Sequence, residues 1–312
     1  MKLPYWTRSA GAGGKIKSPE DFIVKELLHR KYFARYATQG GVRRKEGKYG
    51  LFLLKKRNMT TRDAVQILRR KFGGPIGFAG LKDKKAVTEQ YITMREGTDF
   101  LEENIELRKV GTTDSFLSKG DLLGNEFIIT LHGCNAARLE QAAKKLNRRG
   151  FPNYFGPQRF GSRGNNHFIG RNIVKRKFKE ALRLINKSGG SYSDIRQISK
   201  DVLKFYVNAY QSWLFNAILG GYVRKGGYFG GYLPVAGFST KRTPDVLRKE
   251  KLQPKDFIVD ELRLACSGAR RKAFIKTCLL YTITGNRAVL RFRLPAGSYA
   301  TAVLREITKV PL

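Results

Sequence analysis

One carboxylate stands inside a short run of lysines. Asp83 is flanked by Lys82, Lys84 and Lys85. The preceding residues 76–81 are apolar and include two glycines, and residues 87–94 mix β-branched and aromatic residues with polar ones, as a half-buried strand does. Neighbouring ammonium groups favour the ionised form of an aspartate. The stretch indicates a nucleophile or base presented to a polyanion, and the alternative is an exposed turn with a solvated aspartate.

Other catalytic groups are not arranged in recognisable patterns. The three histidines are isolated, so no metal site is predicted. The sequence contains no phosphate-binding loop of the Gly-x-x-x-x-Gly-Lys-Ser/Thr type, and no Ser/His/Asp or Cys/His arrangement stands out. A lone carboxylate can act on a glycosidic bond, by attacking the sugar carbon or by removing a neighbouring proton. Such chemistry needs no cofactor, and we expect none.

The composition predicts an anionic macromolecular partner. Lysine and arginine number 61 against 25 acidic residues, which gives a net charge of +36. Solubility needs far less charge, so the surface suits a polyanion, most plausibly nucleic acid. An acidic membrane surface is the competing partner, but no single basic amphipathic helix is evident. Aromatic residues make up 12% of the chain and leave some rings free to stack on bases.

Cysteine usage and hydropathy favour a cytosolic protein. Three separated cysteines, Cys134, Cys266 and Cys278, are typical of buried small hydrophobic residues in a reducing compartment. No apolar run approaches the length of a membrane span, and residues 1–17 lack the apolar core of a secretory signal. At 312 residues, one domain and two are equally compatible with the length.

Periodicity predicts several elements in the first half of the chain. A strand is expected to begin near Asp21, and another to cover residues 51–55. Residues 61–72 predict a helix that Thr60 or Thr61 caps and Gly73 ends. A strand over 127–131 and a helix over 135–149 follow. The basic, glycine-rich residues 39–50 suit either a phosphate-tracking loop or a solvated hairpin tip.

The second half of the chain differs in composition and periodicity. Residues 151–172 are rich in glycine, proline, arginine and aromatic residues without periodicity, which suggests a domain junction. Helices are predicted over 175–187 and 199–219, the second buried on a wide face that includes Val202. Glycine-rich residues 220–231 should end it. A strand over 288–294 and a final helix after Ser298 complete the pattern. Residues 19–27 recur at 254–262, where the spacing of apolar residues suits a helix.

Six stretches, in order, resemble one known family. Residues 80–90, Gly-Leu-Lys-Asp-Lys-Lys-Ala-Val-Thr-Glu-Gln, are similar to the signature of the TruD family of tRNA pseudouridine synthases. The family's other motifs are matched by residues 17–26, 123–129, 153–161, 208–216 and 294–306. Together these stretches span nearly the whole chain.

The resemblance implies roles for individual residues. Asp83 takes the place of the family's catalytic aspartate, which detaches uracil and allows it to rejoin the sugar through C5. Phe127 stands where the family carries phenylalanine and could stack on a flipped base, although it could also simply begin a core strand. Asn125 could bond the base edge or hold the loop, and Lys82 could orient the carboxylate or contact RNA. Arg305 is the candidate basic partner of Asp83, with local pairing to Glu306 as the alternative.

Two further residues, Gln158 and Arg159, are expected to line an RNA cleft, with a tight structural hinge as the alternative. Gln211 and Asn216 match a buried helix of the family and are expected to be structural. The family's substrate implies tRNA as the partner and uridine 13, in the D-arm region, as the target.

The resemblance also implies an α+β fold in two parts. Residues 1–152 and 266–312 would form a catalytic domain with a mostly antiparallel mixed sheet flanked by helices. Residues 153–265 would form an inserted α/β domain in a compact form, because the region after Gly161 is short. The Lys84–Lys85 doublet is expected to tighten phosphate contacts. A rival interpretation is a non-catalytic RNA-binding or assembly protein on the same scaffold, and an RNA glycosylase that releases uracil is another.

Overall fold

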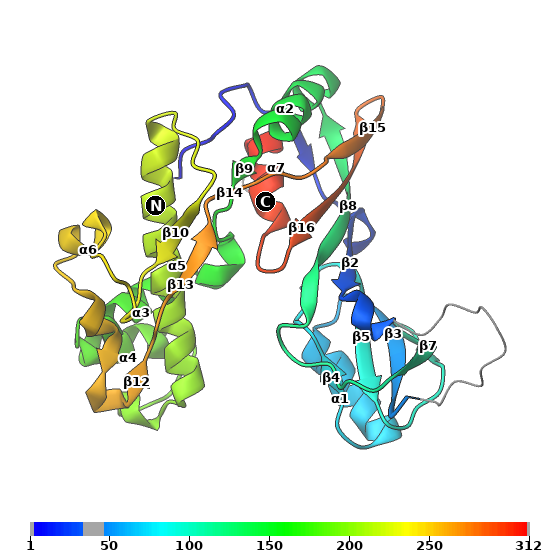
Figure 1. Cartoon of the computed structure of the whole chain (residues 1–312), viewed down its shortest axis with the longest axis horizontal. Coiled ribbons are helices and arrows are strands. Elements are labelled where there is room, and N and C mark those ends of the chain that lie inside the picture. Colours follow the sequence, from blue (N-terminus) through cyan, green and yellow to red (C-terminus); the bar gives the residue numbers. More distant parts are fainter. Residues whose placement is uncertain (1–2, 34–46, 311–312) are drawn as a thin grey trace. The chain divides into compact units, whose positions relative to one another are not determined.

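The computed structural model describes residues 3–33 and 47–310. The chain divides into two compact units (Figure 1). We call Ser9–Arg148, Thr277–Ala300 and Ile307–Leu312 the sheet unit, and Met1–Arg8, Arg149–Lys276 and Thr301–Glu306 the helical unit. Most of the basic loop expected over residues 39–50 lies outside the described residues, and its last two residues begin a strand.

The sheet unit is built on a ten-stranded mixed sheet. Its strand order is β15-β16-β8-β2-β5-β3-β7-β6, with β1 beside β8 and β4 beside β5. Within the described residues, β2 and β5 form its parallel pair and the other neighbours are antiparallel. The strands are β1 Gly13–Lys15, β2 Phe22–Leu28, β3 Tyr49–Arg57, β4 Gly77–Phe78, β5 Val87–Met94, β6 Phe100–Glu102, β7 Ile105–Thr113, β8 Leu122–Cys134, β15 Leu280–Thr284 and β16 Arg287–Pro295. The strands predicted near Asp21 and over 51–55, 87–94, 127–131 and 288–294 are confirmed.

Helix α1, Thr61–Phe72, has the predicted bounds. The Thr60 hydroxyl accepts a hydrogen bond from the Asp63 backbone N–H at 3.2 Å, and the Asp63 carboxylate accepts one from the Thr60 N–H. Gly73 follows with φ 71°, a conformation that glycine adopts without strain. Ala64, Val65 and Leu68 pack against buried side chains of β3 and β5, so α1 covers that part of the sheet.

Two more helices belong to the predicted set. Helix α2, Ala136–Arg149, is capped by the Asn135 side chain, which accepts from the Arg138 N–H at 3.0 Å. Its predicted stripe is buried, namely Leu139, Ala142, Ala143 and Leu146. Helix α7, Ala300–Thr308, follows β16 where a final helix was expected.

The helical unit packs helices around a core centred on α5, Lys200–Arg224 (Figure 1). Helices α3 Asn166–Val174, α4 Phe178–Lys187 and α6 Asp245–Lys249 accompany it. Gly170 lets α3 approach α5 closely, since a Cβ there would lie 2.0 Å from the Tyr206 carbonyl oxygen. Short strand pairs complete the unit: β9 Phe151–Pro152 with β14 Phe274–Ile275, β10 Tyr232–Val235 with β13 Ala269–Lys272, and β11 Ile258–Val259 with β12 Leu264–Ala265.

Several predictions in this part were wrong in detail. Residues 151–172 contain the start of α3, and the helix expected from residue 175 begins at Phe178 because Arg176 adopts a left-handed φ of 56° between α3 and α4. Helix α5 runs through two glycines to Arg224, and Val202 is 42% exposed because it lies on the outward face. Cys278 is exposed, whereas Cys134 and Cys266 are buried as predicted.

The repeated segment folds alike only at its start. Both copies open with a 3-10 turn closed by an aspartate, Asp21 in the first and Asp256 in the second. The first copy continues as β2. The second copy continues as the two-residue strand β11 and then forms another 3-10 turn, which ends at Arg263 with φ 50°. The α-helix predicted for the second copy is therefore wrong.

Two features of the described residues bear on the class of protein. No helix among residues 3–33 and 47–310 is long and apolar enough to cross a membrane. Over the same residues, no group of three or more His, Cys, Asp or Glu side chains is placed to hold a metal ion.

Candidate functional site

The loop between β4 and β5 presents Asp83 to solvent. Asp83, Lys84 and Lys85 are exposed, whereas Lys82 is buried. Although these four charged residues are adjacent in the sequence, they do not form one solvated cluster. The loop leaves Asp83 and two lysines exposed and buries the third lysine, Lys82, in the sheet unit.

A buried ion pair anchors the loop beneath Asp83. The Lys82 Nζ lies 2.5 Å from Glu26 Oε2 on β2, and the two side chains are 4% and 0% exposed. Burial raises the pKa of the Glu26 carboxyl, and the nearby Lys82 charge opposes that rise. Breaking such a pair would leave one charge uncompensated in the interior. The residue preceding Asp83 is thus held firmly.

A second set of buried contacts fixes the loop backbone. The Lys82 N–H donates to Thr61 Oγ1 at 2.9 Å, and that hydroxyl donates to Gln90 Oε1 at 2.8 Å. The Gln90 amide Nε2 donates back to the Gly80 carbonyl at 3.4 Å. Thr61 and Gln90 are both fully buried. The first residue of α1 and the middle of β5 therefore hold the loop from two sides.

Lys56, near the end of β3, contacts Asp83 itself. Its Nζ donates to the Asp83 carbonyl oxygen at 3.1 Å and to the Met59 carbonyl at 2.6 Å. The side chain is 1% exposed. Burial is the main influence and lowers the pKa of Lys56 to about 8. The charges of Asp83 and Asp63 oppose that lowering, and the charge of Lys82 adds to it.

Sheet register places the predicted aromatic and amide residues on the same face as Glu26. Glu26 pairs with Asn125 of β8, and Val24 pairs with Phe127. Directly paired residues point to one face of a sheet, so Asn125 and Phe127 share the face of Glu26. Phe127 is 6% exposed and stacks on Phe292 at 5.5 Å between ring centroids. Phe22 meets it edge-on at 6.2 Å.

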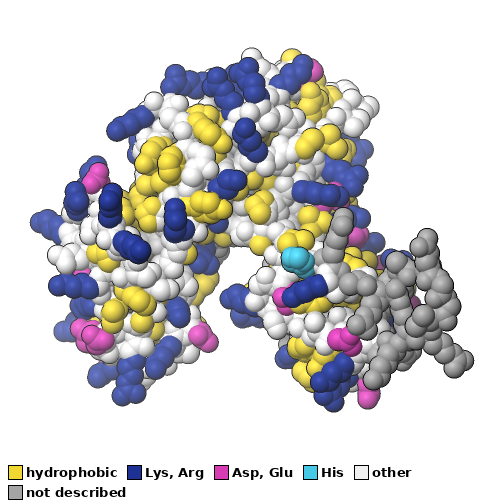
Figure 2. Space-filling view, in the orientation of Figure 1, with side chains coloured by type: hydrophobic (Ala, Val, Ile, Leu, Met, Phe, Trp, Pro, Cys, Tyr) yellow, Lys and Arg dark blue, Asp and Glu magenta, His cyan; other side chains and the backbone are white. Residues whose placement is uncertain are grey.

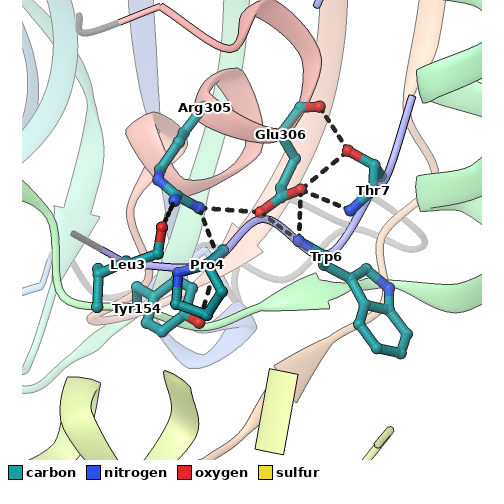
Figure 3. Close-up of polar contacts among 7 residues, drawn as sticks. All are labelled: Leu3, Pro4, Trp6, Thr7, Tyr154, Arg305 and Glu306. Carbon is teal, nitrogen blue, oxygen red and sulfur yellow. Dashed lines mark hydrogen bonds and ion pairs between the residues drawn. The ribbon is translucent and has the colours of Figure 1, made fainter. Parts of the chain in front are cut away.

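The remaining predicted residues belong to the helical unit. The Arg305 guanidinium bonds Glu306 Oε1 at 3.0 Å and the Pro4 carbonyl at 3.2 Å, and it also contacts the Leu3 carbonyl (Figure 3). It lies 3.9 Å from the Tyr5 ring centroid. The local pairing considered as the alternative for Arg305 is thus present, and it ties the N-terminal segment to α7.

Arg159 and Gln158 lie in a 3-10 turn of the helical unit, Pro157–Phe160. The Arg159 Nε donates to Ser212 Oγ at 3.2 Å, and Gln158 is exposed. Asn216 forms two hydrogen bonds with the backbone of Phe155, at 2.9 and 3.0 Å, which is the structural role expected for it.

Four residues of the Asp83 environment were not selected from the sequence: Glu26, Lys56, Thr61 and Gln90. A signal existed for two of them. Phe52, Leu54 and Lys56 alternate along β3, as do Val24, Glu26 and Leu28 along β2, so a period of two already turns both charges inward.

A cavity of about 480 Å³ lies against the opposite face of the same sheet. Its lining includes Ile23, Lys25, Val87 and Glu89, which alternate with the residues described above. Five glutamates line it, namely Glu20, Glu89, Glu102, Glu103 and Glu106. Four basic residues, Lys25, Lys55, Lys56 and Arg57, also line it, so the lining carries no excess of positive charge. The cavity is therefore a poorer candidate for contact with a polyanion than the Asp83 loop.

Comparison with solved structures identifies the fold. A crystal structure from Methanosarcina mazei, titled as a putative tRNA pseudouridine synthase D, superposes with a TM-score of 0.76 at 24% identity and covers 99% of both chains. The fold is therefore the α+β fold of that structure, as expected.

Sequence comparison then identifies the family. The family described as tRNA pseudouridine synthase D (TruD) matches residues 2–188 and 229–307. A probable tRNA pseudouridine synthase D of Thermococcus onnurineus is 30% identical, over 99% of this chain and 98% of the relative. The tRNA pseudouridine synthase D of Aquifex aeolicus is 30% identical, over 93% and 97%. The chain belongs to the tRNA pseudouridine synthase D family and is an enzyme of the isomerase class.

The chain is shorter than its relative from Thermococcus. Their alignment runs over 419 positions, whereas this chain has 312 residues, so more than a hundred aligned positions have no counterpart here. Residues 189–228, which include the motif over 208–216, lie between the two segments that the family matches.

Proposed function

We propose that this protein isomerises a uridine of tRNA, uridine 13 in the D-arm region, to pseudouridine, with Asp83 as the catalytic carboxylate. Family membership supports the reaction class. The observation that carries the residue assignment is the exposed Asp83 on a loop held from below by buried Lys56, Lys82, Thr61 and Gln90. A reactive group that must meet a macromolecule needs both access and a rigid support.

The reaction balances without an added reactant. The bond between uracil N1 and the sugar C1′ breaks, uracil turns, and a bond between C5 and C1′ forms. The proton on C5 is lost and N1, freed from the sugar, gains one, so no net oxidation occurs. Asp83 serves either as the nucleophile at C1′ or as the base that removes a neighbouring sugar proton.

The other residues receive supporting roles in this proposal. Phe127 contributes an apolar floor for the flipped uracil, and Asn125, beside Glu26, offers its amide to the base edge. Lys82 orients the loop rather than contacting RNA, because its ammonium is committed to Glu26. Arg159 and Gln158 contribute to the tRNA-binding surface of the helical unit. In this proposal Arg305 holds the N-terminal segment rather than serving as the basic partner of Asp83, because its guanidinium is committed to Glu306 and the Pro4 carbonyl.

We also propose a catalytic domain of residues 1–152 and 266–312 with an inserted domain over 153–265. The separate cores of the sheet unit and the helical unit support this division. The compact units differ from it in their boundaries: they change over near residues 149 and 276, and residues 1–8 and 301–306 belong to the helical unit.

Charge favours RNA as the partner. Lysine and arginine side chains are spread over the visible surface of each unit, with few acidic ones (Figure 2). A non-catalytic RNA-binding protein would share that surface, so the charge does not distinguish the two functions. Asp83 distinguishes them, because a pure binder has no use for a supported carboxylate.

The test is an isomerisation assay without cofactor. An unmodified tRNA transcript is incubated with the protein, and pseudouridine is mapped by carbodiimide adduct and primer extension. We expect a stop in the D-arm region with the wild type and with Asp201→Asn, an exposed control, and none with Asp83→Asn, which should still bind tRNA. Retained binding without any stop in the wild type favours the RNA-binding protein, and release of free uracil indicates a glycosylase.

A further inference from the structure

Lys56 is a costly residue for a sheet interior. It pairs with Thr88 of β5 on the face that α1 partly covers, in line with Phe52 and Leu54 of its own strand. A buried ammonium loses its hydration, and a strand position of this kind ordinarily carries an apolar side chain. The chain has 61 lysines and arginines to place, so burial of this one calls for a specific reason.

The ammonium joins two segments that meet above the sheet. Met59 belongs to the connection from β3 to α1, and Asp83 to the loop between β4 and β5. Lys56 Nζ donates to the carbonyl oxygens of both, at 2.6 and 3.1 Å. The charged groups that act on it are Asp83, Asp63 at the start of α1, and Lys82. The two aspartates favour its charge, and Lys82 and burial oppose it.

We propose that Lys56 is a positioning residue that clamps the Asp83 backbone and directs its positive charge toward the Asp83 carboxylate. This inference rests on the proposed function of Asp83. The clamp holds the carboxylate at a constant distance from the target sugar. The charge holds the carboxylate against turning away, with little reorganisation when the substrate binds.

The two parts of this role can be separated by titration. A neutral amine still has two N–H donors, enough for both carbonyls, so loss of the proton removes the charge and keeps the clamp. The lowered pKa of Lys56, about 8, places that loss in an accessible range. Methionine removes both clamp and charge. Arginine keeps the charge throughout, since its guanidinium does not deprotonate in proteins.

The experiment measures kcat and KM for pseudouridine formation on the same tRNA between about pH 6 and about pH 10. At neutral pH, Lys56→Met should lower kcat roughly 10- to 100-fold with KM changed less than about threefold, since misplacement of a catalytic group acts on the chemical step. Lys55→Met is the matched control. It removes the next ammonium of β3, which is half-exposed and lies near Glu106 on the opposite face, and should keep wild-type kcat.

The pH profile tests the charge. Wild-type kcat should fall above pH 8, and Lys56→Arg should not show that fall. Titration of the uridine itself would affect both proteins alike. If arginine prevents folding, the residual activity of Lys56→Met should also lack the step near pH 8.

An unchanged kcat in a folded Lys56→Met protein overturns the inference, as does an identical alkaline fall in the wild type and in both variants. Neither result touches the proposed function, provided that Asp83→Asn is inactive. If the wild type forms no pseudouridine, the proposed function itself is wrong.

Discussion

At the scale of single residues, the pairing of Lys82 with Glu26 decides what the lysine run around Asp83 means. Four adjacent charges suggest one solvated cluster, but three point outward and one points inward. The inward ammonium has its partner on β2, far away in the sequence. This buried pair fixes the position of the Asp83 loop and adds little net stability, because the desolvation of two charges offsets much of their attraction.

A double-mutant cycle tests this pair. We expect Glu26→Gln and Lys82→Met each to lower the free energy of unfolding by about 3–5 kcal/mol, because each leaves an uncompensated buried charge or its partner unpaired. The double variant should be far more stable than the sum of the two losses predicts. Urea unfolding gives the free energy of unfolding of the wild type, the two single variants and the double variant. Additive losses would mean that the two side chains do not interact in solution.

At the scale of elements, the start of α1 supports the Asp83 loop. Two adjacent threonines there have different tasks. Thr60 caps the helix through Asp63, whereas the Thr61 hydroxyl connects the Lys82 backbone to Gln90. The helix is therefore both the cover of β3 and β5 and a support of the site.

These threonines make a matched comparison. Thr60→Ala should cost about 1 kcal/mol of stability through loss of the cap and leave kcat unchanged. Thr61→Val should cost about 1–3 kcal/mol, because the Lys82 N–H and Gln90 Oε1 lose buried partners, and should also lower kcat. Thermal unfolding and single-turnover kinetics separate the two effects. Equal kcat in both variants would contradict a role of Thr61 in supporting the loop.

At the scale of the whole molecule, the net charge of +36 governs association with RNA. The two faces of the sheet differ in how their lysines are paired. Lys84 and Lys85 are exposed beside Asp83, whereas Lys25 and Lys55 lie on the cavity face next to Glu89 and Glu106. RNA that approaches Asp83 should meet the first pair and not the second.

Salt dependence tests this orientation. With about 6 phosphate contacts, tRNA affinity should fall roughly a thousandfold between about 50 and about 200 mM salt. Replacing Lys84 and Lys85 together by methionine should reduce the slope of log K against log salt by about 2. Replacing Lys25 and Lys55 should leave that slope unchanged, and Asp83→Asn should do so as well. An equal change from both pairs would place RNA on both faces.

Local patterns were sufficient for much of the sheet unit. The bounds of α1 and β5 follow from periodicity and capping residues, and α2 differs from its prediction by one residue. Prediction was poorer in the helical unit. There a left-handed Arg176 separates two short helices, and α5 continues through glycines because packing compensates for their low helical propensity.

The sequence by itself determined the family, the cationic character and the residue most suited to catalysis, because motifs, composition and spacing are properties of the chain. Tertiary structure decided which charges are buried and what they support. Lys56, Glu26, Thr61 and Gln90 converge on one loop from β3, β2, α1 and β5. Their side chains meet only through the register of strands distant in sequence, and burial gives an ion pair or a lowered lysine pKa its energetic weight.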